Sequence, residues 1–163
     1  MAYGESKHQL DDKYRLNIPR RFLHLFEHGG FLTRAYNGRS LVYYPITVWT
    51  ELQKQLGSVK ERLIAQDPAL FLKAELATDT LTRFLSCGQD VSLDGQGRLT
   101  LPQSLRERAK LTKDVTLIGM GDRIEIWDTA IWEEYDRGLD PAAMGELLST
   151  LSQRPGPATP MLV

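Results

Sequence analysis

The stretch LDDKYRLNIP, residues 10–19, returns as LDGQGRLTLP, residues 93–102, and this repeat decides the fold. The second copy lies 83 positions after the first, and nine of the 43 positions from Leu10 to Leu52 are identical at that offset without a gap. A period this long, present only twice, indicates a tandem duplication of a small domain and not a solenoid. Both copies contain an Asp followed four residues later by an Arg. We call residues 11–15 the first turn and residues 94–98 the second turn.

The overall composition is that of a globular chain with an uneven charge distribution. The chain has 163 residues, 42% of them hydrophobic, which suffices for the core of one ordinary domain or of two small ones. The formal net charge of −1 does not indicate nucleic acid, but residues 1–39 have a balance of +3 and residues 122–163 one of −5. Such a distribution is either ordinary surface variation or a sign that one face attracts phosphate.

Few residues are suited to metal, redox or membrane chemistry. Cys87 is the only cysteine, which excludes an intrachain disulfide framework or a cysteine-rich zinc site, and the three histidines are too scattered to suggest a metal cluster. The sequence therefore predicts no metal and no cofactor. No apolar run approaches the ~18–20 residues of a membrane span, and the N-terminus lacks the apolar stretch of a signal peptide. We expect no membrane partner and a cytoplasmic location.

Each copy predicts the same order of elements: a strand, the turn, a second strand ended by a proline, a short helix, a hairpin and a last helix. Pro19 and Pro102 lack a backbone donor and close the second strands. The strands are expected at residues 7–10, 15–18, 31–34 and 41–44, and again at 90–93, 98–101, 115–118 and 124–127. The short helices are expected at 20–27 and 103–110. Asp128 is placed to cap the last helix.

The repeat and its surroundings predict four segments. Residues 5–52 form the first domain, residues 53–87 a helical insert, residues 88–135 the second domain, and residues 136–163 a C-terminal helix with a disordered tail from Ser152. Asp67-Pro68 marks a helix start in the insert. A unit of about 45 residues has too small a core to stand alone, so the two units are expected to pair and complete each other's sheet. The predicted class is mainly β with short helices (α+β), with Trp49 and Trp132 as core anchors.

The paired Asp and Arg of each turn argue against catalysis. A carboxylate next to a guanidinium is stabilised as the anion and makes a poor general base. The chain also lacks a nucleophile with a neighbouring histidine, an HExxH motif and a glycine-rich phosphate loop. The sequence therefore predicts no enzyme and no small-molecule substrate.

Binding fits the paired turns better. An Arg at the start of a strand, held by an Asp across the turn, has a fixed direction and can pair with guanine O6 and N7 or with phosphate. One such turn alone would favour a stabilising ion pair without a partner, because Asp-x-x-x-Arg is a weak pattern. Duplication in register, with Lys13, Arg20 and Arg21 beside the first copy and Arg106 and Arg108 beyond the second, favours binding.

These stretches resemble the MraZ family, bacterial regulators with two SpoVT-AbrB-type domains in one chain. The resemblance covers about residues 5–135 and rests on LDDKYRLNIP, on RFLSCGQDVSLDGQGRLTLP and on LIGMGDRIEIWD. It implies two tandem AbrB-like swapped-hairpin units that form an intrachain pseudo-dimer. It also implies a nucleoid-associated, ring-shaped homo-oligomer that binds short direct DNA repeats upstream of its own division and cell-wall gene cluster and represses that cluster.

The resemblance also assigns residues. The DNA-contacting arginine of the family matches Arg15, with Arg98 as its equivalent in the second copy. Tyr14 departs from the family, which has Gly there, as this chain does at Gly97; a positive φ at Tyr14 would cost about 1 kcal/mol. The candidate DNA-binding residues are Arg15, Arg98, Lys13, Asp11, Asp94, Gln96, Arg20 and Arg21.

Two other functions are compatible with the same fold. One is a ring-forming scaffold for protein interaction and assembly that does not bind DNA specifically, which the near-neutral charge and acidic C-terminal third support. The other is an AbrB-like antitoxin, although antitoxins of this kind carry one domain and a longer toxin-wrapping tail. Salt dependence separates DNA binding from an apolar protein contact.

Overall fold

The computed structural model describes residues 1–152 and divides the chain into two compact units, Met1–Trp132 and Glu133–Val163. Residues 153–163 of the tail predicted to be disordered lie outside the described residues. The fold class is α+β, as predicted, with antiparallel strands and several helices. No helix of the described part is long and apolar enough to cross a membrane.

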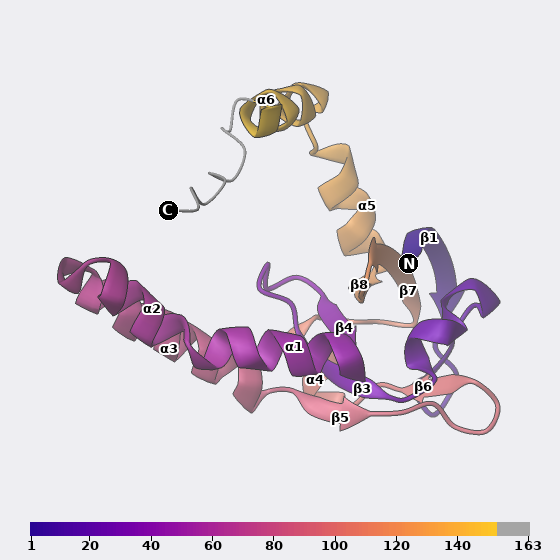
Figure 1. The fold of residues 1–163 in the computed structure, drawn as a ribbon. Helices are drawn as coiled ribbons and strands as arrows, with labels where there is room; N and C mark the ends of the chain where they lie inside the picture. The colour runs from indigo at the N-terminus through magenta and orange to yellow at the C-terminus, as the bar shows by residue number, and fades with distance from the viewer. Residues whose placement is uncertain (153–163) are drawn as a thin grey trace, which may run out of the picture. The chain divides into compact units, whose positions relative to one another are not determined.

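The first unit contains a six-stranded sheet and a separate two-stranded one. The large sheet has the order β1-β7-β8-β4-β3-β5, and the small one pairs β2 with β6 (Figure 1). The strands of the first copy are β1 (Ala2–Gln9), β2 (Arg15–Asn17), β3 (Gly30–Arg34) and β4 (Leu41–Pro45). Those of the second copy are β5 (Gln89–Val91), β6 (Arg98–Thr100), β7 (Asp114–Gly121) and β8 (Ile124–Asp128).

Strands from the two copies are mixed in the large sheet, in the order first, second, second, first, first, second copy. The hairpins β3–β4 and β7–β8 meet where β4 pairs with β8. Strand β1 of the first copy pairs with β7 of the second, and β5 of the second copy pairs with β3 of the first. Each copy therefore contributes its first strand to the other copy's hairpin. The eight paired residues of β1 also explain why this strand is longer than the predicted residues 7–10.

Helices follow the strands in the predicted order. After β2 comes η1 (Arg20–Phe26), so the short helix predicted at residues 20–27 is present as a 3-10 helix, whereas α4 (Gln103–Arg108) after β6 is α-helical. The hairpins lead into α1 (Ile46–Gly57) and α5 (Thr129–Arg137). The Asp128 carboxylate accepts the backbone N–H groups of Ala130 and Ile131, which confirms its predicted capping role.

The insert between the copies is helical. It contains α2 (Val59–Gln66), the short η2 (Pro68–Leu70) and α3 (Phe71–Ser86). Asp67 accepts the N–H of Ala69 at 2.9 Å, so the predicted helix start is confirmed, although a 3-10 turn precedes α3. The hydroxyl of Thr33 on β3 donates to the carbonyl of Phe84 at 2.7 Å, which joins the end of α3 to the sheet. In the second unit, α6 spans Pro141–Ser152.

Two tryptophans anchor the interior, but only one of them is the predicted residue. Trp49 is 4% exposed and stacks on Phe31 with ring centroids 3.9 Å apart. Trp132 is only partly buried, so the prediction for it was wrong. Trp127 takes the core position instead, because strand β8 is buried along its whole length and carries this side chain. Trp132 packs edge-on against the Trp127 ring.

Candidate nucleic-acid interface

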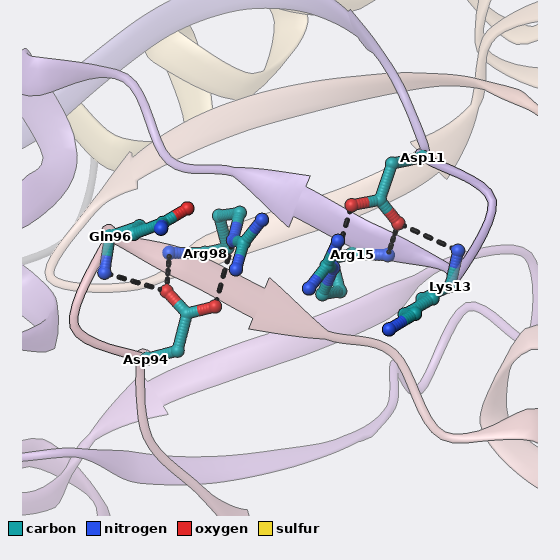
Figure 2. Close-up of polar contacts among 6 residues, drawn as sticks. All are labelled: Asp11, Lys13, Arg15, Asp94, Gln96 and Arg98. Carbon is teal, nitrogen blue, oxygen red and sulfur yellow. Dashed lines mark hydrogen bonds and ion pairs between the residues drawn. The ribbon is translucent and has the colours of Figure 1, made fainter.

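The two-stranded sheet, which we call the β2–β6 ribbon, brings the two copies of the repeated motif together. Its register pairs Arg15 with Thr100, Leu16 with Leu99 and Asn17 with Arg98. Because successive side chains of a strand point to opposite faces, one face of the ribbon is apolar and the other polar. Leu16 and Leu99 are completely buried in the core, so Arg15 and Arg98 lie together on the outer face (Figure 2).

The first turn is held by the carboxylate of Asp11. One carboxylate oxygen accepts the backbone N–H of Lys13 at 2.8 Å and that of Arg15 at 3.0 Å. The other accepts Nε of the Arg15 side chain at 2.6 Å. The N–H of Tyr14 donates to the carbonyl of Asp11 at 2.9 Å and closes the turn. The carboxylate thus determines both the backbone path and the direction of the guanidinium.

The second turn repeats this geometry. One oxygen of Asp94 accepts the N–H groups of Gln96 at 2.9 Å and Arg98 at 3.0 Å, and the other accepts Arg98 Nε at 2.8 Å. The N–H of Gly97 donates to the carbonyl of Asp94 at 3.0 Å. The bonds are the same although the three residues between Asp and Arg differ in the two turns, so the geometry depends on the Asp and the Arg.

Each guanidinium uses only Nε inside the turn. Within residues 1–152, Nη1 and Nη2 of Arg15 and Arg98 make no hydrogen bond. The two side chains keep 26% and 21% of their area accessible, enough for a ligand to reach these nitrogens. A guanidinium that is held at Nε and has Nη1 and Nη2 without a hydrogen-bond partner is suited to bidentate binding of phosphate or of a guanine edge.

The carboxylates are held as anions. The backbone N–H of Arg15 lowers the pKa of Asp11 most, followed by the bond from the Arg15 side chain. The backbone N–H of Arg98 lowers the pKa of Asp94 in the same way. Both groups are therefore poor general bases at neutral pH, and their role is to orient the arginines.

These lowered pKa values predict an acid-sensitive fold. A carboxyl whose pKa is lower in the folded state than its usual 3.8 stabilises the fold above that value, and this stabilisation is lost as the pH falls through the folded-state pKa. We expect the urea concentration at the midpoint of unfolding to decrease as the pH falls below about 4. The decrease should be smaller in the Asp11→Asn/Asp94→Asn variant. Urea unfolding between pH 7 and pH 3 measures this. An equal drop in both proteins would contradict it.

Tyr14 has the conformation of the glycine that it replaces. Its φ is 57°, close to the 74° of Gly97, so this residue bears the predicted left-handed strain. Tyr14 is 50% exposed, and the guanidinium carbon of Arg106 lies 3.4 Å from the centroid of its ring. In the sequence Arg106 is a cation beyond the second copy, and nothing there links it to Tyr14.

The remaining candidate residues differ in their surroundings. Lys13 and Gln96 are exposed at the tips of the two turns (Figure 2). Arg20 is exposed at the start of η1. Arg21 makes contacts within the fold: its guanidinium donates to the carbonyl of Glu5 on β1 and lies over the Phe22 ring.

Two polar side chains on the ribbon's outer face were not among the predicted site residues. Asn17 and Thr100 are exposed there beside the arginines. The alternation along the two strands could have identified both. Among the described residues, no group of three or more His, Cys, Asp or Glu could hold a metal ion.

Two comparisons with known proteins find similarity to this chain. The sequence model of a family described as "MraZ protein, putative antitoxin-like" matches residues 84–146. The chain is 36% identical over 137 residues to a protein of Moorella thermoacetica named transcriptional regulator MraZ. That alignment covers 84% of this chain and 87% of the relative.

Proposed function

The chain belongs to the MraZ family, and from this premise we propose that it is a transcriptional regulator that binds DNA through the outer face of the β2–β6 ribbon. The observation that carries the proposal is the pair of turns with the same hydrogen bonds, which place Arg15 and Arg98 on one face of the ribbon, with Nη1 and Nη2 making no hydrogen bond within residues 1–152. The relative's name describes a regulator and not an enzyme.

The shape of the ribbon supports recognition in the major groove. That groove is wide enough to admit a two-stranded β-ribbon, and arginine pairs there with O6 and N7 of guanine. Asn17 lies opposite Arg98 and Thr100 opposite Arg15, so each arginine has a smaller polar neighbour on the same face. Asparagine suits adenine and threonine suits the thymine methyl group. Lys13 and Gln96 at the turn tips, and the exposed Arg20 at the start of η1, are proposed to contact phosphates.

We propose that the two copies form a tandem AbrB-like swapped-hairpin pseudo-dimer. The pairing of β1 with β7 and of β5 with β3 supports this arrangement, because each copy lends a strand to the other. The domains are proposed at residues 5–52 and 88–135, with the insert at 53–87 and the C-terminal segment at 136–163.

The family resemblance extends the proposal to assembly and target. We propose a ring-shaped homo-oligomer in the cytoplasm that associates with the nucleoid, binds direct repeats in its own promoter region, and represses its division and cell-wall gene cluster. In a ring, several weak contacts act together and raise the affinity steeply. Repeats spaced by about one helical turn, roughly 10 bp, would present the same groove face to successive ribbons.

A gel-shift titration tests the proposed function. The wild-type protein is titrated against DNA from upstream of its own gene at two salt concentrations, with random DNA as competitor. We expect a shift that resists the competitor and weakens steeply with salt, because each neutralised phosphate contributes about −0.9 to the slope of log K against log salt. No shift at low salt would contradict the proposal and favour the assembly scaffold.

A further inference from the structure

Arg106 lies beside the first turn although it belongs to the second copy of the repeat. Helix α4, which carries it, starts directly after β6, and the N–H of Leu101 donates to the carbonyl of Tyr14 at 3.0 Å. This bond holds the start of the helix against the turn. The Arg106 guanidinium covers the Tyr14 ring with its carbon 3.4 Å from the ring centroid.

The Arg106 side chain is held at two points. Its plane rests on the ring of Tyr14, and its Nε donates to the carbonyl of Leu101 at 3.0 Å. The adjacent carboxylate, Glu107, accepts a bond from Gln103 at 2.8 Å. Arg106 forms no ion pair within the described residues, and its Nη1 and Nη2 make no hydrogen bond there. The charge is therefore fixed in place and not neutralised by a neighbour.

The second turn has no such pair. Gly97 stands where the first turn has Tyr14, and Leu23, 83 positions before Arg106, takes the matching place. A methyl group of Leu23 lies 3.6 Å from the position that a Cβ on Gly97 would occupy. The turn tips also differ in charge, because the first has Lys13 where the second has the neutral Gln96. Around the ribbon, the first turn thus has two cations, Lys13 and Arg106, where the second has neutral side chains.

We propose that Arg106 binds a DNA backbone phosphate beside the first turn and that Tyr14 is its positioning residue. A guanidinium stacked on an aromatic ring keeps its outer nitrogens available for a phosphate. The proposal explains why a tyrosine occupies a backbone conformation that favours glycine, since a glycine there would leave Arg106 without its platform. This inference rests on the proposed function.

The unequal turns also give the ribbon a direction on DNA. A ribbon with two equivalent halves binds equally well in either orientation. With Arg106 and Lys13 beside one arginine only, the first turn holds the backbone more strongly than the second. Oriented binding of this kind suits direct repeats, in which every site points the same way, and not inverted repeats.

The affinity of single variants for DNA from upstream of the gene tests the role of Arg106. We expect Arg106→Ala to bind about tenfold more weakly for each engaged subunit and to reduce the steepness of the salt dependence by about 0.9 for each engaged subunit, the contribution of one phosphate contact. Arg108→Ala is the matched control, because it removes the same charge from the same short helix at an exposed position. An equal loss in both variants would overturn the assignment.

Tyr14 variants test the positioning role separately from folding. Tyr14→Phe keeps the ring and should bind like the wild type, whereas Tyr14→Gly should show the weaker affinity and the reduced salt slope of Arg106→Ala. The Arg15 geometry should survive in Tyr14→Gly, because the second turn forms the same bonds with Gly97.

The outcomes separate the two proposals. If the wild type and Arg15→Ala differ as expected but Arg106→Ala and Tyr14→Gly match the wild type, this inference alone is wrong. If the wild type shows no salt-sensitive binding, the proposed function fails and this inference fails with it.

Discussion

Replacing Arg15 by alanine is expected to abolish sequence-specific DNA binding while the protein remains folded. The variant loses the guanidinium that Asp11 orients on the outer face of the ribbon. A bidentate pair with a base contributes about 1–3 kcal/mol of discrimination, which is roughly 5- to 150-fold at each site. In a ring the loss is repeated in every subunit, so the combined effect should leave no measurable specific complex.

Fluorescence anisotropy against the upstream DNA measures the effect of Arg15→Ala. Arg83→Ala is a matched control, because it also removes one positive charge. Arg83 belongs to helix α3, which is not part of the β2–β6 ribbon. The urea midpoint should change little, since the Asp11–Arg15 pair is partly exposed and screened by solvent. Unchanged affinity in Arg15→Ala would show that the first turn is not the DNA-binding site.

Arg98→Ala provides a comparison within the same ribbon. The second turn has the same hydrogen bonds but lacks the extra cations of the first. We therefore expect Arg98→Ala to weaken binding in the same direction as Arg15→Ala, and by a smaller factor.

Leu99→Ala is expected to have the largest effect on stability. Leu99 is completely buried at the centre of β6, directly opposite the equally buried Leu16. Truncating a buried leucine to alanine costs about 2–5 kcal/mol, because apolar contacts are lost and a cavity remains. For a chain of this length the melting temperature should fall by roughly 5–15 °C.

Thermal unfolding measures the effect of Leu99→Ala. The neighbouring Thr100→Ala is the control, since this side chain is on the exposed face of the same strand and its loss should change the stability by less than about 0.5 kcal/mol. A melting temperature in Leu99→Ala close to that of the wild type would mean that the ribbon is not packed on the core.

The sequence predicted the two turns well because their geometry is local. Each Asp reaches backbone N–H groups two and four residues ahead, and the side chain of the same Arg. Contacts of this range depend on a few neighbouring residues, so a repeated motif forms a repeated structure. The Asp67 and Asp128 helix starts were predictable for the same reason.

The tertiary structure decided what depends on residues far apart in the chain. The α+β class, the turns and most helix positions follow from residues close together, because short-range hydrogen bonds and hydrophobic periodicity determine them. The order of strands in the large sheet, the burial of Trp127 in place of Trp132 and the contact between Tyr14 and Arg106 do not. These depend on which distant surfaces exclude water together, and only the packed chain determines that.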